Sequence, residues 1–207
     1  MTSYIKNYAS KSGAEIKIRG IIPKKTVTLP AFVTSFSDSM TSSWNEEAVY
    51  GRPDVIGTYQ STQRRISIGF DLPSMDLAEA KKNLGNINKI KQFMYPAYNS
   101  NVQPASANLP QVTTNALSLA KAPLVRIKFA NLIDSDNEHG LLGWIASFTA
   151  TPVIDMGMFN EGSEKNAKLY PKVYNVSIDF VPQHEFDLGY KVGAAGEPTA
   201  IDKSKFT

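Results

Sequence analysis

The chain repeatedly alternates apolar and polar residues with a period of two, the pattern of half-buried β-strands. The clearest case is 65–72, where Ile66, Ile68 and Phe70 alternate with charged, hydroxyl or glycine residues. Further strands are predicted at 14–20, 124–133, 141–154 and 174–180. The stretch 26–37 contains Pro30, which predicts an edge strand or a bend. We therefore expect about five or six strands.

One segment, 76–95, has the period of a helix. Its apolar residues fall near one stripe, which comprises Leu77, Ala80, Leu84, Ile87 and Met94. Asp76 and Glu79 form a variant of the capping box, and Pro96 stops the helix. Gly85 should weaken this helix by about 1 kcal/mol relative to Ala. The predicted fold is α+β, a mainly antiparallel β sandwich or barrel with one packed α-helix.

The connecting segments differ in what they predict. The stretch 38–62 is polar with scattered aromatic residues, and it predicts no strand. The long segment 99–120, rich in Asn, Ser, Pro, Gln and Thr, predicts either a functional loop or a partly mobile segment. The turn 134–140 joins the two strands around it as a hairpin. We expect one domain over 1–186 and a C-terminal arm over 187–207.

Composition limits the possible functions. The 207 residues are 42% hydrophobic and 20% charged with a net charge of +3, which is ordinary for a globular protein. No cysteine is present, so disulfides and thiol chemistry are excluded. No apolar run reaches the roughly 18 residues of a membrane span, and the start lacks an apolar signal core. We expect the product to stay in the cytoplasm of the cell that makes it and to have no membrane partner.

Candidate catalytic and metal sites are weak. The chain has two histidines, His139 and His184, but it has no Gly-x-Ser-x-Gly motif that would position a nucleophilic serine. Asp134, Asp136 and Glu138 resemble a calcium loop, but the sixth and twelfth positions hold His139 and Ile145. A polar hairpin turn explains these acids better. We therefore predict no catalytic residue, metal or cofactor, and no enzymatic activity.

Basic residues near aromatic ones leave a nucleic-acid alternative open. Arg64 and Arg65 lie near Tyr59 in sequence, and Arg126 and Lys128 share a predicted strand. Small β-barrels bind single strands with such residues, but acids are interspersed here and no basic cluster builds up. A small β-barrel that binds single-stranded nucleic acid remains the alternative of a different class.

The segment 32–70 resembles tail-tube-like baseplate proteins of contractile-tailed phages, the tube initiators or tube caps of the central hub. Val49-Tyr50-Gly51-Arg52-x-Asp54 carries the resemblance most clearly, followed by Tyr59, Thr62 and Arg64 and then by an alternating strand. Phe32, Phe36, Asp38 and Trp44-Asn45 precede that motif. The resemblance covers roughly 15–186. Pro53 precedes Asp54, whereas relatives more often place proline after the aspartate, and the chain after Phe186 is too short for the LysM module that some relatives carry.

The resemblance implies a tail-tube fold and a ring of six subunits whose inner strands form one barrel around an open lumen. Such a ring sits in the virion baseplate after assembly in the host cytoplasm, contacts the hub or spike proteins, and templates the tail tube, with the sheath as a further candidate partner. DNA passes through the lumen without specific binding. The major tail tube protein is the alternative within this class.

The residues expected at subunit interfaces are Trp44, Tyr50, Arg52, Asp54, Tyr59 and Arg64. Arg52 suits a bidentate pair with Asp54 or with a carboxylate of a neighbour, and Tyr50 suits an interface anchor. The simpler alternative is a turn at Gly51-Arg52-Pro53 with a solvated arginine. From sequence the two interpretations have about equal weight.

Overall fold

The structure is a computed structural model that describes residues 15–30, 32–98, 119–135, 138–162, 167–193 and 196–201. Its main body is one seven-stranded antiparallel sheet with the strand order β2-β1-β7-β8-β11-β4-β3. The strands are β1 (Glu15–Gly20), β2 (Lys25–Pro30), β3 (Phe32–Glu47), β4 (Ile56–Pro73), β7 (Val125–Phe129), β8 (Leu141–Pro152) and β11 (Val173–Pro182).

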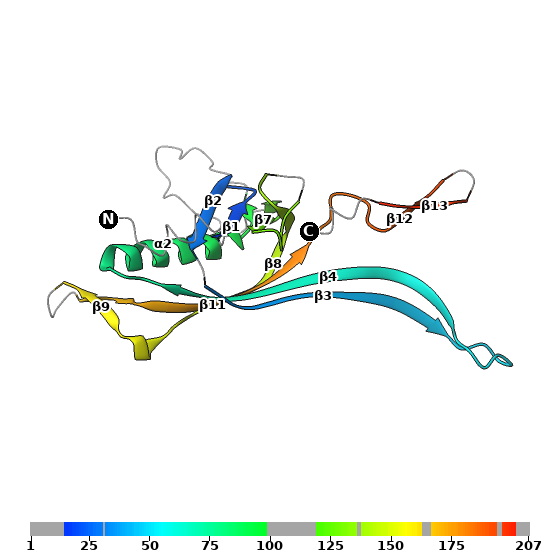
Figure 1. Cartoon of the computed structure of the whole chain (residues 1–207), viewed down its shortest axis with the longest axis horizontal. Coiled ribbons are helices and arrows are strands. Elements are labelled where there is room, and N and C mark those ends of the chain that lie inside the picture. The colour runs from blue at the N-terminus through cyan, green and yellow to red at the C-terminus, as the bar shows by residue number, and fades with distance from the viewer. Residues whose placement is uncertain are drawn as a thin grey trace, which may run out of the picture.

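The sheet is open within the described residues, with β2 at one edge and β3 at the other, so no barrel closes inside the protomer. Figure 1 shows β1, β2 and β7 above the plane of β11, β4 and β3, with α2 (Leu77–Phe93) beside them. The prediction of a mainly antiparallel β protein with one packed helix is confirmed. The prediction of a barrel is not met by the protomer alone.

A single hydrophobic core joins the two halves of the sheet. Ile16 and Ile18 on β1 and Ile66, Ile68 and Phe70 on β4 are each at most 1% exposed. These are the apolar positions of the predicted alternating strands, because alternate side chains of a strand point to one face. The curled sheet and the helix α2 therefore bury the apolar faces of β1, β2, β7, β11 and the inner half of β4, whereas most of β3 stays exposed.

The helix starts and ends as its sequence predicts. Asp76 is the N-cap and its side chain accepts a hydrogen bond from the Glu79 amide at 2.6 Å. The Glu79 carboxylate in turn accepts from the Met75 amide at 2.9 Å, so the capping box closes one residue earlier than its usual form. The helix buries Ala80, Ile87, Ile90 and Phe93. No helix in the described segments is long and apolar enough to cross a membrane.

The stretch 38–62 departs from its prediction because it forms most of one long hairpin. Here β3 runs 16 residues and β4 runs 18 residues, paired from Phe32–Asp71 to Glu47–Ile56. Sequence analysis missed it because both faces of these strands are largely polar, which removes the alternation signal. Pro30 does end β2, and β2 and β3 are the two edge strands, as the proline predicted.

Shorter elements complete the described chain. They are β5 (Ala97–Tyr98), β6 (Leu119–Lys121), η1 (Ile154–Met156), β9 (Met158–Glu161), β10 (Lys168–Pro171), β12 (Tyr190–Val192) and β13 (Pro198–Ala200). The hairpin β12–β13 falls in the predicted C-terminal arm, and β7 pairs with β8 as predicted. Most of the predicted loop 99–120 lies outside the described residues.

Candidate assembly surface

The outer part of the β3–β4 hairpin projects from the body as a two-stranded ribbon. The strand β11 pairs with β4 only from Ile66 to Pro73, so the part of β4 from Ile56 to Arg65 contacts β3 alone. At about 3.3 Å per residue, these ten residues extend roughly 30 Å. Figure 1 shows the ribbon running far beyond the rest of the sheet. We call residues 39–65 the ribbon.

A free-standing ribbon of this length needs an external partner to be well ordered, because two-stranded hairpins are marginally stable in water. Both of its edges lack a partner strand in the described residues: β3 along its whole length and β4 from Ile56 to Arg65. A row of unpaired backbone N–H and C=O groups is a template for pairing with another chain. The ribbon is thus a candidate assembly element.

One face of the ribbon continues the core side of the sheet and carries its aromatic residues. Trp44 and Tyr59 are directly opposite, with ring centroids 5.3 Å apart at an interplanar angle of 72°. The Trp44 indole N–H donates to Ser42 at 3.3 Å, and the Tyr59 hydroxyl lies 2.7 Å from the Thr62 hydroxyl. Trp44 remains 54% exposed and Tyr59 52% exposed. The pair is therefore an aromatic contact that leaves about half of each side chain exposed on the ribbon.

The opposite face is a broad polar surface that spans four strands. We name it the hydroxyl face; it comprises Ser35, Ser37, Ser39, Thr41 and Ser43 on β3, Ser61, Gln63, Arg65, Ser67, Gly69 and Asp71 on β4, Asn175, Ser177 and Asp179 on β11, and Ser147, Thr149 and Thr151 on β8. The registers place Ser35, Gly69, Ser177 and Thr149 in one row. None of these positions is buried.

The root of the ribbon is fixed by an ion pair. The Arg64 guanidinium donates to both carboxylate oxygens of Asp38, with Nε 2.9 and 3.0 Å from Oδ1 and Oδ2 and Nη2 2.5 Å from Oδ2. The Arg64 side chain is 5% exposed and that of Asp38 is 29% exposed. Arg64 is therefore buried within the protomer in a pair with Asp38, whereas its sequence neighbour Arg65 lies on the hydroxyl face.

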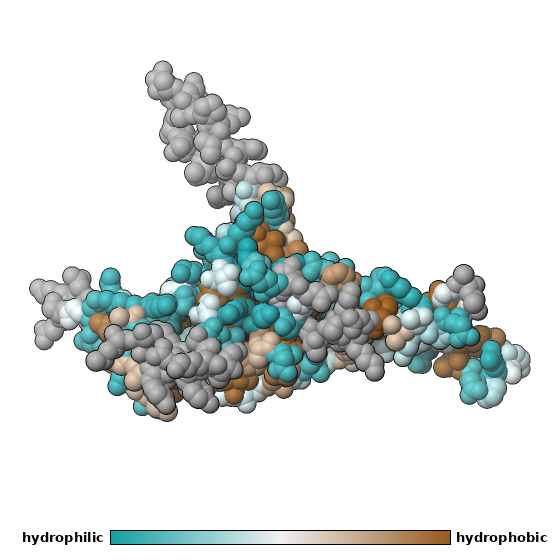
Figure 2. Space-filling model, turned by 45° about the horizontal axis from the view of Figure 1, so that its top comes forward, coloured by the Kyte–Doolittle hydropathy of each residue, from teal (hydrophilic) through white to brown (hydrophobic). Residues whose placement is uncertain are grey.

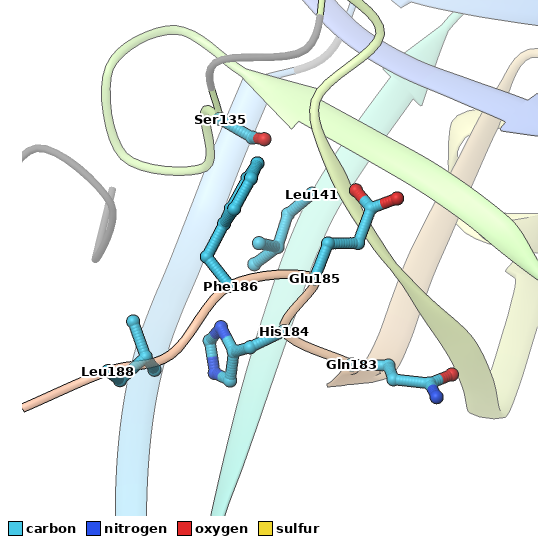
Figure 3. A pocket seen from close by; sticks show the side chains of 7 residues that line it. All are labelled: Ser135, Leu141, Gln183, His184, Glu185, Phe186 and Leu188. Carbon is cyan, nitrogen blue, oxygen red and sulfur yellow. The ribbon is translucent and has the colours of Figure 1, made fainter.

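The segment after β11 crosses this root. Figure 3 shows His184 and Leu188 in front of β3 and β4, while Phe186 points toward Ser135. Burial, and then the nearby Arg64 charge, lower the pKa of His184, while Asp38 opposes that shift. Arg126 holds the segment by donating to Glu185 at 2.6 Å and to the Gly140 carbonyl at 3.0 Å. The small cavity here measures about 10 Å³, which suits one water.

The tip of the ribbon holds the motif that carried the resemblance. Tyr50 is fully exposed, and the Arg52 amide donates to the Val49 carbonyl at 3.2 Å to form the turn. Arg52 has no ion pair with any described residue, so the intramolecular Arg52–Asp54 pair is not present. Figure 2 shows hydrophobic surface at the far end of the ribbon. The structure thus brings five of the six expected interface residues onto the projecting ribbon and its tip and places Arg64 in its root.

The remaining sequence candidates have structural roles. His139 is hydrogen bonded to Arg19. Asp134 accepts from the Ser135 amide and pairs with Lys128, each at 2.8 Å, as in a turn; Asp136 lies outside the described residues. No cluster of three metal-ligating side chains occurs among the residues that the structure describes. No protein-family model matches the chain, and no curated protein sequence matches it.

Sequence analysis missed the hydroxyl face and the free strand edges. The first had a signal, because hydroxyl residues recur at every second position from Ser35 to Ser43. The positions between them mix apolar and polar residues, so this period-two pattern lacks the consistently apolar face that marks a half-buried strand. The edges had no such signal, since pairing partners far apart in the chain determine which strand lies outermost.

Proposed function

We propose that the protein is a structural subunit that closes into a ring by pairing the free edge of β3 with β8 of a neighbouring copy. The strand β8 contacts β7 only through Leu141–Gly143, so its edge from Trp144 to Pro152 has no partner strand in the described residues. The single observation that carries the proposal is this pair of complementary free edges on either side of β8-β11-β4-β3.

The strand directions support such closure. Because all neighbours in the sheet are antiparallel, the four strands alternate in direction and β3 runs opposite to β8. Pairing β3 with β8 of the next copy therefore continues the antiparallel order without a break. A closed ring of such sheets leaves no edge exposed.

The two faces of these strands suit the inside and outside of a ring. The core side of the four strands is covered by α2, β1 and β2 of the same protomer, so it must face outward. The hydroxyl face then lines the lumen, where water satisfies its side chains. Six copies, the number implied by the resemblance, give 24 strands; at about 4.8 Å per strand the barrel is at least about 37 Å across. Barrels of about 16–18 strands already hold a water-filled channel.

Together with the resemblance of 32–70, these features support a more specific role. We infer that the ring is the tube-initiating ring of a contractile phage-tail baseplate, seated on hub or spike proteins and templating the tail tube. DNA passes through its lumen without specific binding, and the sheath is a further candidate partner. The major tail tube protein has the same architecture; copy number per virion separates one or two rings from many.

Engineered cysteines test the edge pairing, since the chain has none of its own. Ser37 and Ser147 lie in one row, three strands apart within a protomer. That is about 14 Å, too far for an intramolecular disulfide, which needs Cα atoms within about 7 Å. Ser37→Cys is combined in turn with Ser147→Cys, Thr149→Cys and Thr151→Cys, so that the three pairs cover successive staggers between neighbouring copies.

At least one pair should give a ladder of covalent oligomers under oxidation, ending at the ring size. The matched control is Ser67→Cys with Ser147→Cys, in which Ser67 lies on the same face as Ser37 but on β4, between its partner strands β3 and β11. Electron microscopy of the uncrosslinked chain should show rings. A chain that stays monomeric at high concentration and yields no ladder with any of the three pairs would refute ring formation. Salt-sensitive binding of single-stranded DNA by a persistent monomer would favour the nucleic-acid alternative instead.

A further inference from the structure

A groove opens on the hydroxyl face where β11 ends and β4 continues into the ribbon. It measures about 360 Å³ and is lined by Ser39, Thr41, Gln63, Arg64, Arg65 and Val181. The groove exists because the pairing of β11 with β4 ends at Ile66, so among the described residues no strand covers the outer part of β4 on its side away from β3. Arg65 is exposed here, and its guanidinium has no ion pair with any described residue.

The hydroxyl face carries two acids, which accept hydrogen bonds from neighbouring side chains, and one arginine, which has no ion pair with a described residue. Its two acids are engaged: Asp179 accepts from the Ser67 hydroxyl at 2.6 Å, and Asp71 accepts from the Asn175 amide at 2.8 Å. Arg65 is the single cation of this face as defined above. Both acids lie toward the body, whereas Arg65 lies at the start of the ribbon. A passing polyanion would therefore meet its attractive charge at the groove.

We propose that Arg65 and the hydroxyl and amide groups beside it form a contact site for the phosphates of a DNA backbone. A guanidinium with Ser, Thr and Gln side chains is the donor set that proteins use on phosphate oxygens, and such contacts carry no sequence information. This inference rests on the proposed function, because a ring places one groove per copy around the lumen. The result is a belt of arginines that holds DNA loosely and lets it slide.

The strength of the contact must be low and dependent on salt. Each phosphate that is neutralised contributes a slope of about −0.9 in log affinity against log salt concentration for duplex DNA. With one arginine per copy, a duplex on the axis engages only a few phosphates at a time. Binding should be measurable at low salt and should disappear near physiological salt, consistent with passage rather than storage.

The test is a titration of a fluorescent DNA duplex of about 30 base pairs with the full chain, read by anisotropy at several salt concentrations. Arg65→Gln should reduce affinity at low salt about tenfold and flatten the salt slope, whereas Arg65→Lys should restore most of it. The matched control is Lys89→Gln on the exposed face of α2, which removes the same charge from the outer side. It should bind like the unmodified chain.

Several outcomes overturn the proposal. If Arg65→Gln and Lys89→Gln lose the same amount of DNA affinity, the net charge of the chain alone explains the binding. Absence of DNA binding at low salt also overturns the proposal. If a poly-glutamate of matched length binds as tightly as the DNA duplex, the site attracts anions in general and does not recognise phosphates. If no ring forms, the proposed function fails, but the groove lies within one protomer and the same titration of the monomer still decides whether Arg65 contacts DNA.

Discussion

The Arg64–Asp38 ion pair should respond unequally to the loss of its two partners. Asp38→Ala removes the carboxylate that neutralises a guanidinium whose side chain is 5% exposed. Loss of one partner of a buried pair costs about 3–5 kcal/mol, because a buried charge loses its compensation. Asp38 itself is 29% exposed, so water can enter when its side chain is removed. We therefore expect about 2–4 kcal/mol of destabilisation.

Replacing the arginine instead of the aspartate should lower the free energy of unfolding by less. Arg64→Met keeps most of the apolar stem and leaves Asp38 partly accessible to water, so its cost should be about 1 kcal/mol or less. The double variant should resemble Arg64→Met, since replacing both charges by apolar groups is often near neutral. A double-mutant cycle should then give a coupling energy equal in size to the cost of Asp38→Ala, about 2–4 kcal/mol.

Urea unfolding followed by circular dichroism measures these free energies, at a protein concentration at which each variant is monomeric. Unchanged slopes of free energy against urea would show that the change lies in stability rather than in the unfolded state. Equal losses in the two single variants, or a smaller loss in Asp38→Ala, would refute the assignment of Arg64 as a buried charge that depends on Asp38.

Three further outcomes follow from the described contacts. Gly85→Ala should raise the free energy of unfolding by about 0.5–1 kcal/mol in urea titrations, because a Cβ there meets no described atom within 4 Å. Asp76→Ala should lower it by about 1 kcal/mol through loss of the N-cap, with Asp76→Asn retaining most of it. The pKa of His184 is lowered in the folded state, so between the folded and unfolded pKa values the unfolded chain binds more protons than the folded one. The free energy of unfolding should therefore fall as the pH drops through that window. Urea titrations at successive pH values should show a smaller fall for His184→Gln than for the unmodified chain.

The core strands and the helix could be predicted from sequence because local pattern and tertiary burial agree there. Ile66, Ile68 and Phe70 alternate with polar residues and are buried on one face, and Asp76 with Glu79 marks the helix start. The ribbon could not be predicted in this way. Its hydrogen bonds form between two strands that bury little surface, so no apolar period distinguishes them from a polar loop.

The candidate site was predicted in part. Trp44, Tyr50 and Tyr59 were singled out as aromatic residues in a polar stretch, and the structure places them exposed on the ribbon. Arg64 and Arg65 are adjacent and chemically identical, yet one is buried and one is exposed. Only the strand register decides which of them faces the core, because a shift by one residue exchanges the faces.

The open edges at β3 and β8 have a consequence for how assembly proceeds. If copies join edge to edge, every incomplete arc keeps two unsatisfied ends, whatever its number of subunits. Only the last addition removes both ends at once, so it gains one more interface than any earlier step. Arcs should then be scarce at equilibrium, and a sedimentation profile should be dominated by single chains and finished circles.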